Sequence, residues 1–375
     1  MTTFHRAHKI ELIVDERQAT YFKKACGCAR FAYNWALAQW KADYAAYKAN
    51  PMLEKPSQFS IRKKLNAIKR QAFPWMLEVT KCAPQLAIIQ LGKSFANFWR
   101  NPEHFKYPKF KKKFVDDSFT ISNDHFKVEG SRISIPKLGW VSMRESLRFE
   151  NAKLLSATVS RHGKRWYVSL SCELENLNHL KAAENQGTVG VDLGIKSLAV
   201  LSNHKHVEAP KPYITMMKKL KREQRKLARC QLGSHNREKQ RLKVAEVHRR
   251  IFNIRQNSLH QLTHYLTSHF SRIVIEDLNV RGMLKNHHLS QRIADIGFYE
   301  FRRQLQYKCQ QRGCELIVAD RFYPSSKTCG YCGCKNESLT LSDRHWQCPH
   351  CQKLIADRDF NAAINLKNYQ SEHRG

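Results

Sequence analysis

The chain has 375 residues, more than a single compact core usually holds, so we expect two or three domains. Lysine and arginine number 65 against 32 aspartates and glutamates, a formal net charge of +33, which predicts a polyanionic partner. No stretch approaches the roughly 18 apolar residues of a membrane span and Met1–Val14 lacks the apolar core of a signal peptide, so we expect nucleic acid, not a membrane.

The N-terminal segment predicts a strand followed by a helical lobe. His8–Val14 alternates polar and apolar residues, as a half-buried strand does. Asp15, with Gln18 three residues later, is typical of a capping box that opens a helix. Apolar residues then recur at helical spacing, and Ile61–Arg70 and Gln85–Trp99 continue the pattern. We therefore predict a helical lobe over residues 16–100.

A basic loop and a set of strands follow. Asn101–Lys113 contains two prolines, three aromatic residues and six lysines or histidines. Phe119–Ile135, Trp140–Met143 and Leu155–Leu174 show the two-residue alternation of strands, with Glu129-Gly130 and His162-Gly163 as turn signals between strands. We predict that residues 1–15 and 101–180 form a β-barrel-like domain into which the helical lobe is inserted.

A polar linker at Asn176–Gln186 separates this part from a mixed α/β domain. Short apolar strands are expected near 188–193, 197–202, 271–276 and 314–319, with mainly helical sequence over 216–270. The helix before the last strand should end at Gly313. We assign residues 187–320 and 356–375 to this domain.

Three carboxylates stand where these elements begin or end. Asp192 and Glu276 each close an apolar run that predicts a buried strand, and Asp359 opens a helical run. Converging carboxylates repel one another unless cations neutralise them, as in sites that hold two Mg²⁺ or Mn²⁺ ions for phosphodiester hydrolysis. Each acid could instead be an ordinary turn or cap residue. Asp277 and Asp357 are adjacent alternatives, which we rank lower because of strand alternation and distance from the helix start.

Five of the 12 cysteines lie between Cys329 and Cys351. Two C-x₂-C pairs fifteen residues apart match a zinc ribbon, assigned here to residues 321–355: Cys329, Cys332, Cys348 and Cys351. With all four ligands supplied by the protein, the zinc should be structural. A hairpin at Ser338–Gln347 is expected to bring the pairs together. Exchange of one ligand with Cys334, His345 or His350 is the less favoured alternative.

Several segments together resemble the TnpB family, the RNA-guided endonucleases encoded by insertion sequences and similar to type V CRISPR effectors. They are RFAYNWAL, KYPKFKKK, GVDLGIKSLAV, IEDLN with LSQRIADIGFYEFRRQLQYKC, SSKTCGYCG and DRDFNAAINL, in that order over nearly the whole chain. The resemblance implies a RuvC-like, RNase H type nuclease domain in which Asp192, Glu276 and Asp359 match the catalytic acids. It also implies a wedge role for the β domain and a recognition role for the helical lobe.

Basic residues supply candidate nucleic-acid contacts. Lys218–Arg255 carries fourteen lysines and arginines against three glutamates, which favours guide RNA or heteroduplex contact over a solvated helix face. In the 106–113 loop, lysines alternate with aromatic residues, which suits backbone contact with base stacking or, equally, a buried anchor. The residues singled out are Lys109, Lys111, Lys112, Arg222, Arg225 and Lys226, with Lys81 and Gln85 at a helix start that could reach base edges or simply be exposed.

We therefore expect an RNA-guided DNA endonuclease of a mobile element that cuts next to a short adjacent motif and uses structural Zn²⁺ and catalytic Mg²⁺ or Mn²⁺. Its partners would be a guide RNA from the element end and double-stranded target DNA, with a functional link to a separate transposase. Prokaryotic cytoplasm, in association with the nucleoid, is the expected location. The alternatives are a catalytically silent RNA-guided repressor and an unguided structure-specific nuclease.

Overall fold

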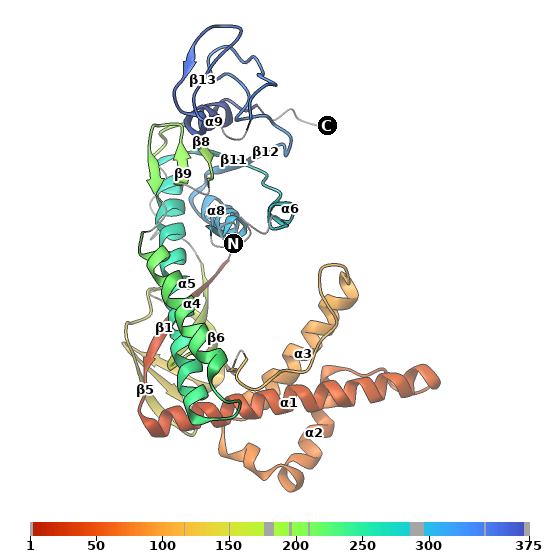
Figure 1. Ribbon diagram of the computed structural model, residues 1–375. Helices are drawn as coiled ribbons and strands as arrows, with labels where there is room; N and C mark the ends of the chain where they lie inside the picture. Colours follow the sequence, from red (N-terminus) through yellow and green to blue (C-terminus); the bar gives the residue numbers. More distant parts are fainter. Residues whose placement is uncertain are drawn as a thin grey trace. The chain divides into compact units, whose positions relative to one another are not determined.

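The computed structural model describes residues 3–115, 117–149, 151–175, 184–194, 197–208, 211–285, 296–340 and 343–370. The chain forms two compact units, residues 1–176 and 177–375 (Figure 1). Most of the predicted linker and the LSQRIAD part of the family motif lie outside the described residues. No helix among the described residues is long and apolar enough to cross a membrane.

The first unit is built on a seven-stranded antiparallel sheet with the order β2-β6-β7-β1-β5-β4-β3. The N-terminal strand β1 lies in its middle, between β7 and β5. The edge strands β2 and β3 are joined by only a short 3-10 turn, so the sheet curls as a barrel does. The segment Phe119–Ile135 contains three strands: the predicted turn at Glu129-Gly130 separates the last two, and a 3-10 turn separates the first two. The bounds are β1 (Phe4–Ile13), β2 (Ser118–Ser122), β3 (Lys127–Glu129), β4 (Arg132–Ile135), β5 (Gly139–Met143), β6 (Lys153–His162) and β7 (Arg165–Leu174).

The helical lobe is inserted between β1 and β2, as predicted. It comprises α1 (Glu16–Ala49), α2 (Gln58–Ala72) and α3 (Cys82–Arg100). The predicted capping box is present. The Asp15 carboxylate accepts the backbone N–H of Gln18, and the Gln18 side-chain oxygen accepts the backbone N–H of Asp15. Phe22 of α1 packs on Phe119 and Trp166 of the sheet, with ring centroids 5.9 and 5.1 Å apart. Helices and sheet therefore share one hydrophobic core.

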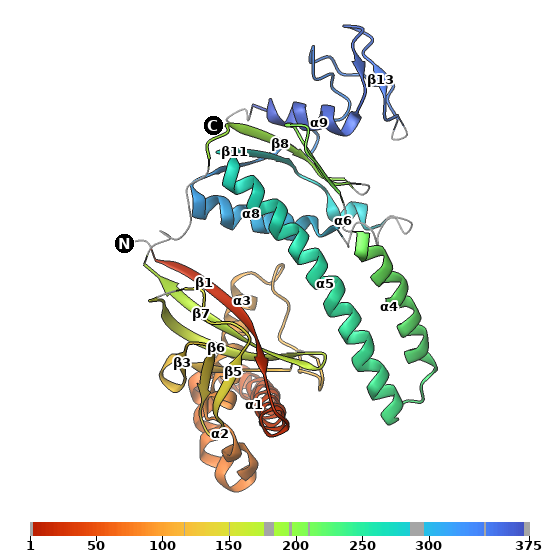
Figure 2. The ribbon, with the colours of Figure 1, turned by 90° about the vertical axis from the view of Figure 1, so that its left-hand side faces the viewer.

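The second unit contains a five-stranded sheet with the order β10-β9-β8-β11-β12. The three strands β8 (Thr188–Asp192), β11 (Arg272–Glu276) and β12 (Glu315–Ala319) are parallel, whereas β9 (Ser197–Leu201) and β10 (His206–Glu208) form antiparallel pairs beside them. Helices α5 (His235–His269) and α8 (Phe298–Arg312) cover one face, and α9 (Arg358–Lys367) covers the other (Figure 2). This layered α/β arrangement confirms the expected fold class.

The second unit contains further helices besides those that cover its sheet. Helix α4 (Lys211–Arg229) forms a hairpin with α5, and the short α6 (Val280–Met283) follows β11. Helix α8 ends at Gly313 with φ +73°, as predicted.

The cysteine segment differs from the prediction. The hairpin expected over Ser338–Gln347 is not formed by the described residues of that range. There β13 (Trp346–Gln347) pairs with β14 (Leu354–Ile355), and the two strands flank the second knuckle instead of joining the two. An isolated antiparallel bridge between Thr328 and Lys335 flanks the first knuckle in the same way. Each knuckle is therefore a tight turn between its own pair of extended residues.

Candidate active site and metal centre

Two of the predicted acids lie side by side at the carboxyl ends of adjacent parallel strands. Val191 of β8 is paired in register with Ile275 of β11, and each is followed directly by its acid, Asp192 or Glu276. Residues in register point to the same side of a sheet, so the two side chains share a face. The crevice beyond the carboxyl ends of parallel strands is the usual ligand site of such sheets.

Helix α9 brings the third acid to the same edge. Gly190 lies two residues before Asp192 and faces the same side of the sheet. A Cβ on Gly190 would stand 2.0 Å from the carbonyl oxygen of Ala363 and 2.4 Å from the backbone nitrogen of Lys367, so α9 can approach β8 only because this residue is glycine. Asp359 is in the first turn of α9 and therefore lies near the end of β8.

The charges of Glu276 and Asp359 act on Asp192. Burial, followed by the negative charges of Glu276 and Asp359, raises the pKa of Asp192 well above its ordinary value. Burial also raises the pKa of Glu276, against the opposing effect of the hydrogen bond that the Ser325 hydroxyl donates to its carboxylate. Ionised carboxylates in such a setting favour a divalent cation, and oxygen ligands of this kind suit Mg²⁺ or Mn²⁺.

The two adjacent aspartates have other partners. Asp277 accepts bonds from Arg302 of α8 at 2.8 Å and from Arg321 at 2.6 Å. Asp357 is the N-cap of α9, and its Oδ1 accepts the backbone N–H groups of Asp359 and Phe360 at 2.9 and 3.2 Å. Both aspartates are therefore engaged by groups of the protein itself.

The polar face of α9 holds the chain that leads into the first cysteine knuckle. The Asn365 side-chain amide donates to the carbonyl oxygens of Ser325 and Thr328, both at 2.7 Å. Asn361 donates to the Thr328 carbonyl oxygen at 2.7 Å and accepts the Gly330 N–H at 2.8 Å. Since Ser325 also contacts Glu276, the knuckle, α9 and the second acid form one connected structure.

This connection was not predicted from the sequence. Arg358 is buried, and its guanidinium donates to the Thr340 carbonyl oxygen at 2.7 Å and to the Ser326 hydroxyl at 3.2 Å. Arg344 contacts the Asp359 carboxylate at 3.0 Å. Gly190, a glycine inside an apolar strand, was the one visible signal, since such a glycine often marks a close approach of another backbone.

The four predicted thiols converge. Their sulfur atoms all lie within 4.8 Å of one another, with Cys329 3.7 Å from Cys351 and Cys332 3.6 Å from Cys348. Tetrahedral zinc with Zn–S bonds of about 2.3 Å places its sulfurs about 3.8 Å apart, so the cluster could hold zinc. The backbone N–H of Cys351 is the main cause that lowers the pKa of the Cys348 thiol to about 6, which favours the thiolate that binds metal.

A second group in this segment comprises Cys332, Cys334 and His350, whose ligand atoms also lie within 4.8 Å of one another. It shares Cys332 with the four-thiol cluster. The ligand exchange considered from the sequence therefore has a geometric basis for Cys334 and His350. The His345 ring instead contacts the Ala356 carbonyl oxygen.

The predicted nucleic-acid residues of the first unit differ in exposure. Lys81 is exposed at the N-cap of α3, and Gln85 is half-buried one turn further on. Lys109 and Lys112 are exposed. Lys111 is half-buried. Its Nζ lies 4.4 Å from the Tyr33 ring centroid and donates to Gln90 Oε1 on α3 at 3.3 Å.

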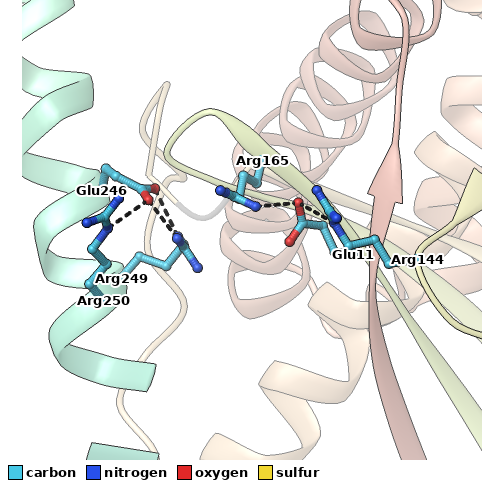
Figure 3. Close-up of polar contacts among 6 residues, drawn as sticks. All are labelled: Glu11, Arg144, Arg165, Glu246, Arg249 and Arg250. Atoms are coloured by element: carbon cyan, nitrogen blue, oxygen red, sulfur yellow. Dashed lines mark hydrogen bonds and ion pairs between the residues drawn. The ribbon is translucent and has the colours of Figure 1, made fainter. Parts of the chain in front are cut away.

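The glutamates on the α4–α5 hairpin are all engaged by basic residues. Glu223 contacts Arg222 and Lys226 at 3.4 and 3.8 Å, while Arg225 is exposed. Figure 3 shows Glu246 of α5 with Arg249 and Arg250, at 2.6 and 3.4 Å.

The β1 strand of the first unit has a similar pattern, also drawn in Figure 3. Glu11 contacts Arg165 at 2.7 Å and Arg144 at 3.3 Å. One carboxylate against two guanidinium groups leaves a net positive charge, so such sites still favour a phosphate backbone.

The fold and its two clusters define a class: a RuvC-like, RNase H type domain that carries a four-cysteine ribbon. Three family models match the chain, described as "Probable transposase" (residues 169–287), "Cas12f1-like, TNB domain" (298–366) and "Helix-turn-helix domain" (1–49). Despite the last description, the described residues 3–49 form one strand and a single helix.

Curated relatives and a solved structure agree with the family models. The chain is 35% identical over 371 residues to a "Putative RNA-guided DNA endonuclease" of Streptomyces pristinaespiralis, covering 98% of this chain and 89% of the relative. It is 31% identical to the similarly named InsQ of Escherichia coli, covering 96% and 91%. A Cas12f1–sgRNA–target DNA complex shares the fold with a TM-score of 0.61 at 14% identity, covering 95% and 84%. The chain belongs to the TnpB family.

Proposed function

We propose that this protein is an RNA-guided DNA endonuclease of a mobile element, which cuts target DNA beside a short adjacent motif by metal-dependent hydrolysis. The observation that carries the proposal is the convergence of Asp192 and Glu276 in register, with Asp359 beside them on α9. The names of the full-length relatives from Streptomyces pristinaespiralis and Escherichia coli support the guided nature of the activity.

The three acids would act as ligands for two Mg²⁺ or Mn²⁺ ions. When bound, such ions activate water and stabilise the leaving 3′ oxygen. Ser325 orients the Glu276 carboxylate, and Gly190 sets the distance of Asp359 from β8. Arg344 neutralises Asp359 in the metal-free chain and lies within reach of a phosphate that approaches this acid.

The four thiolates would hold one structural Zn²⁺, because no ligand position remains for water. Folded around that ion, the first knuckle would keep Thr328 and Gly330 in place for Asn361 and Asn365. The zinc ribbon therefore supports the geometry of the nuclease centre from outside it.

The other segments would supply the partners' binding surfaces. The helical lobe, with Lys81 and Gln85, would read the adjacent DNA motif, and the β domain would hold the RNA as a wedge. The basic α4–α5 hairpin, with Arg222, Arg225 and Lys226, and the loop lysines Lys109 and Lys112 would contact guide RNA or heteroduplex. We further propose a nucleoid-associated cytoplasmic protein that works alongside a separate transposase.

Exchange of the guide segment tests the guided activity. The protein is co-purified with its element-end RNA, and the guide is replaced by a second sequence. The cuts should move to the matching target and require Mg²⁺ or Mn²⁺. Cuts that stay at the same DNA structures without regard to the guide would instead identify an unguided nuclease, and guided binding without cuts would identify a repressor.

A further inference from the structure

A cavity of about 370 Å³ adjoins Glu276 on the α8 side of the sheet edge. Its walls come from the end of β11, the loop into α6, the start of α8 and Arg321 after β12. It lies beyond the carboxyl ends of the parallel strands, where α/β sheets bind ligands. Its volume lies within the range of small-ligand sites.

The cavity combines a buried aromatic floor with an exposed aromatic rim. Phe298 and Phe301 are 5% and 1% exposed and form part of the apolar floor. Tyr299, between them in sequence, is 77% exposed although it lines the same cavity. A large ring held at a helix start and open to solvent is suited to stack on an unpaired base.

The polar wall contains Arg302 and Arg321 as well as Glu276. Arg302 and Arg321 both bind the single carboxylate of Asp277, so two guanidinium groups face one negative charge. Their side chains are 42% and 50% exposed. Partly exposed arginines bind phosphates readily.

We propose that this cavity is a subsite for one unstacked nucleotide of the DNA strand being cut. The base stacks on Tyr299 above Phe298, and the phosphate lies toward Arg321. Because Glu276 is part of the same wall, the seated nucleotide fixes which phosphodiester reaches the acids. The base must leave its duplex stack to enter, so the subsite selects single-stranded DNA at the cut. This inference rests on the proposed nuclease function.

Single-turnover cleavage by the assembled protein–RNA complex tests the subsite. The DNA carries an abasic nucleotide at each position around the cut in turn. Tyr299→Ala should slow cleavage about 5- to 100-fold, the range of lost base stacking, with no change in guide-directed binding. Tyr299→Phe keeps the ring and should cut at the wild-type rate. An abasic nucleotide at one position should slow the wild type similarly and slow Tyr299→Ala no further. If an abasic nucleotide slowed Tyr299→Ala as much as the wild type at every position, the proposal would be overturned.

A second measurement does not need cleavage. DNA with 2-aminopurine at the same positions is bound in Ca²⁺, and its fluorescence should be quenched at one position by the wild type and Tyr299→Phe but not by Tyr299→Ala. Quenching without any cutting of intact DNA by the wild type in Mg²⁺ would leave the subsite standing and refute the nuclease function. Equal fluorescence in all three proteins would refute the subsite and indicate that another partner, such as a protein segment, covers the cavity.

Discussion

Replacing Gly190 by alanine should displace the helix that carries the third acid. The added Cβ would lie 2.0 Å from a backbone oxygen of α9, whereas real Cβ contacts are essentially never shorter than 3.0 Å. The helix must therefore move by about 1 Å, because neither the strand nor the helix backbone can rotate away. Overpacking of this kind destabilises a fold by about 1–3 kcal/mol, and a displacement of about 1 Å at a reacting group slows catalysis about 100-fold.

The assay for Gly190→Ala combines urea unfolding with single-turnover cleavage by the assembled complex. The variant should unfold at lower urea and cut about 100-fold more slowly while its guide-directed DNA binding stays at the wild-type level. Gly27→Ala is the matched control. A Cβ there meets only the Arg30 guanidinium, at 3.9 Å, and alanine favours the α1 helix. Wild-type stability and rate in Gly190→Ala would refute the proposed role of close α9 packing.

Three further predictions concern the Asn365 hydrogen bonds, the four-cysteine cluster and Asp192. Asn365→Ala leaves the Ser325 carbonyl oxygen without its donor and the Thr328 carbonyl oxygen with Asn361 alone. The variant should lower stability by about 1–3 kcal/mol in urea unfolding and slow cutting, whereas an unchanged rate would separate the knuckle from the site. A chelator should release one zinc per chain, measured with a metal-sensitive dye, and lower the melting temperature; Cys348→Ser should contain none. Because the folded-state pKa of Asp192 is raised, metal-free protein should lose stability as pH rises through that pKa. Asp192→Asn should remove this pH dependence and raise the melting temperature at neutral pH, while abolishing cutting.

Much of the fold followed from local sequence rules. The capping box at Asp15 and the glycine end at Gly313 depend on contacts within a few residues, so patterns could predict both. Strand alternation also predicted that the N-terminal strand belongs with the later β segment. The turn at Glu129-Gly130 was predicted from its glycine, whereas the break before it was not, because the 3-10 turn Asn123–His125 interrupts the alternation only briefly.

The acids and thiols of the site could be predicted from the sequence, but the hydrogen bonds that hold them in place could not. Asp192 and Glu276 are visible because each ends an apolar run. The contacts of Asn365 with Ser325 join residues 40 positions apart, and no local pattern encodes them. The same applies to the hairpin in the cysteine segment, since closure around each knuckle depends on the metal-binding turns rather than on strand propensity.

Cleavage of a plasmid library in Mg²⁺ by the protein with its element-end RNA, with wild type compared to Asp192→Ala, is the most direct test of the nuclease centre. We expect guide-directed cuts beside one short motif for the wild type, and guide-directed binding without cuts for the variant. Equal cutting by both proteins would contradict the assignment of the nuclease centre to the edge formed by β8, β11 and α9.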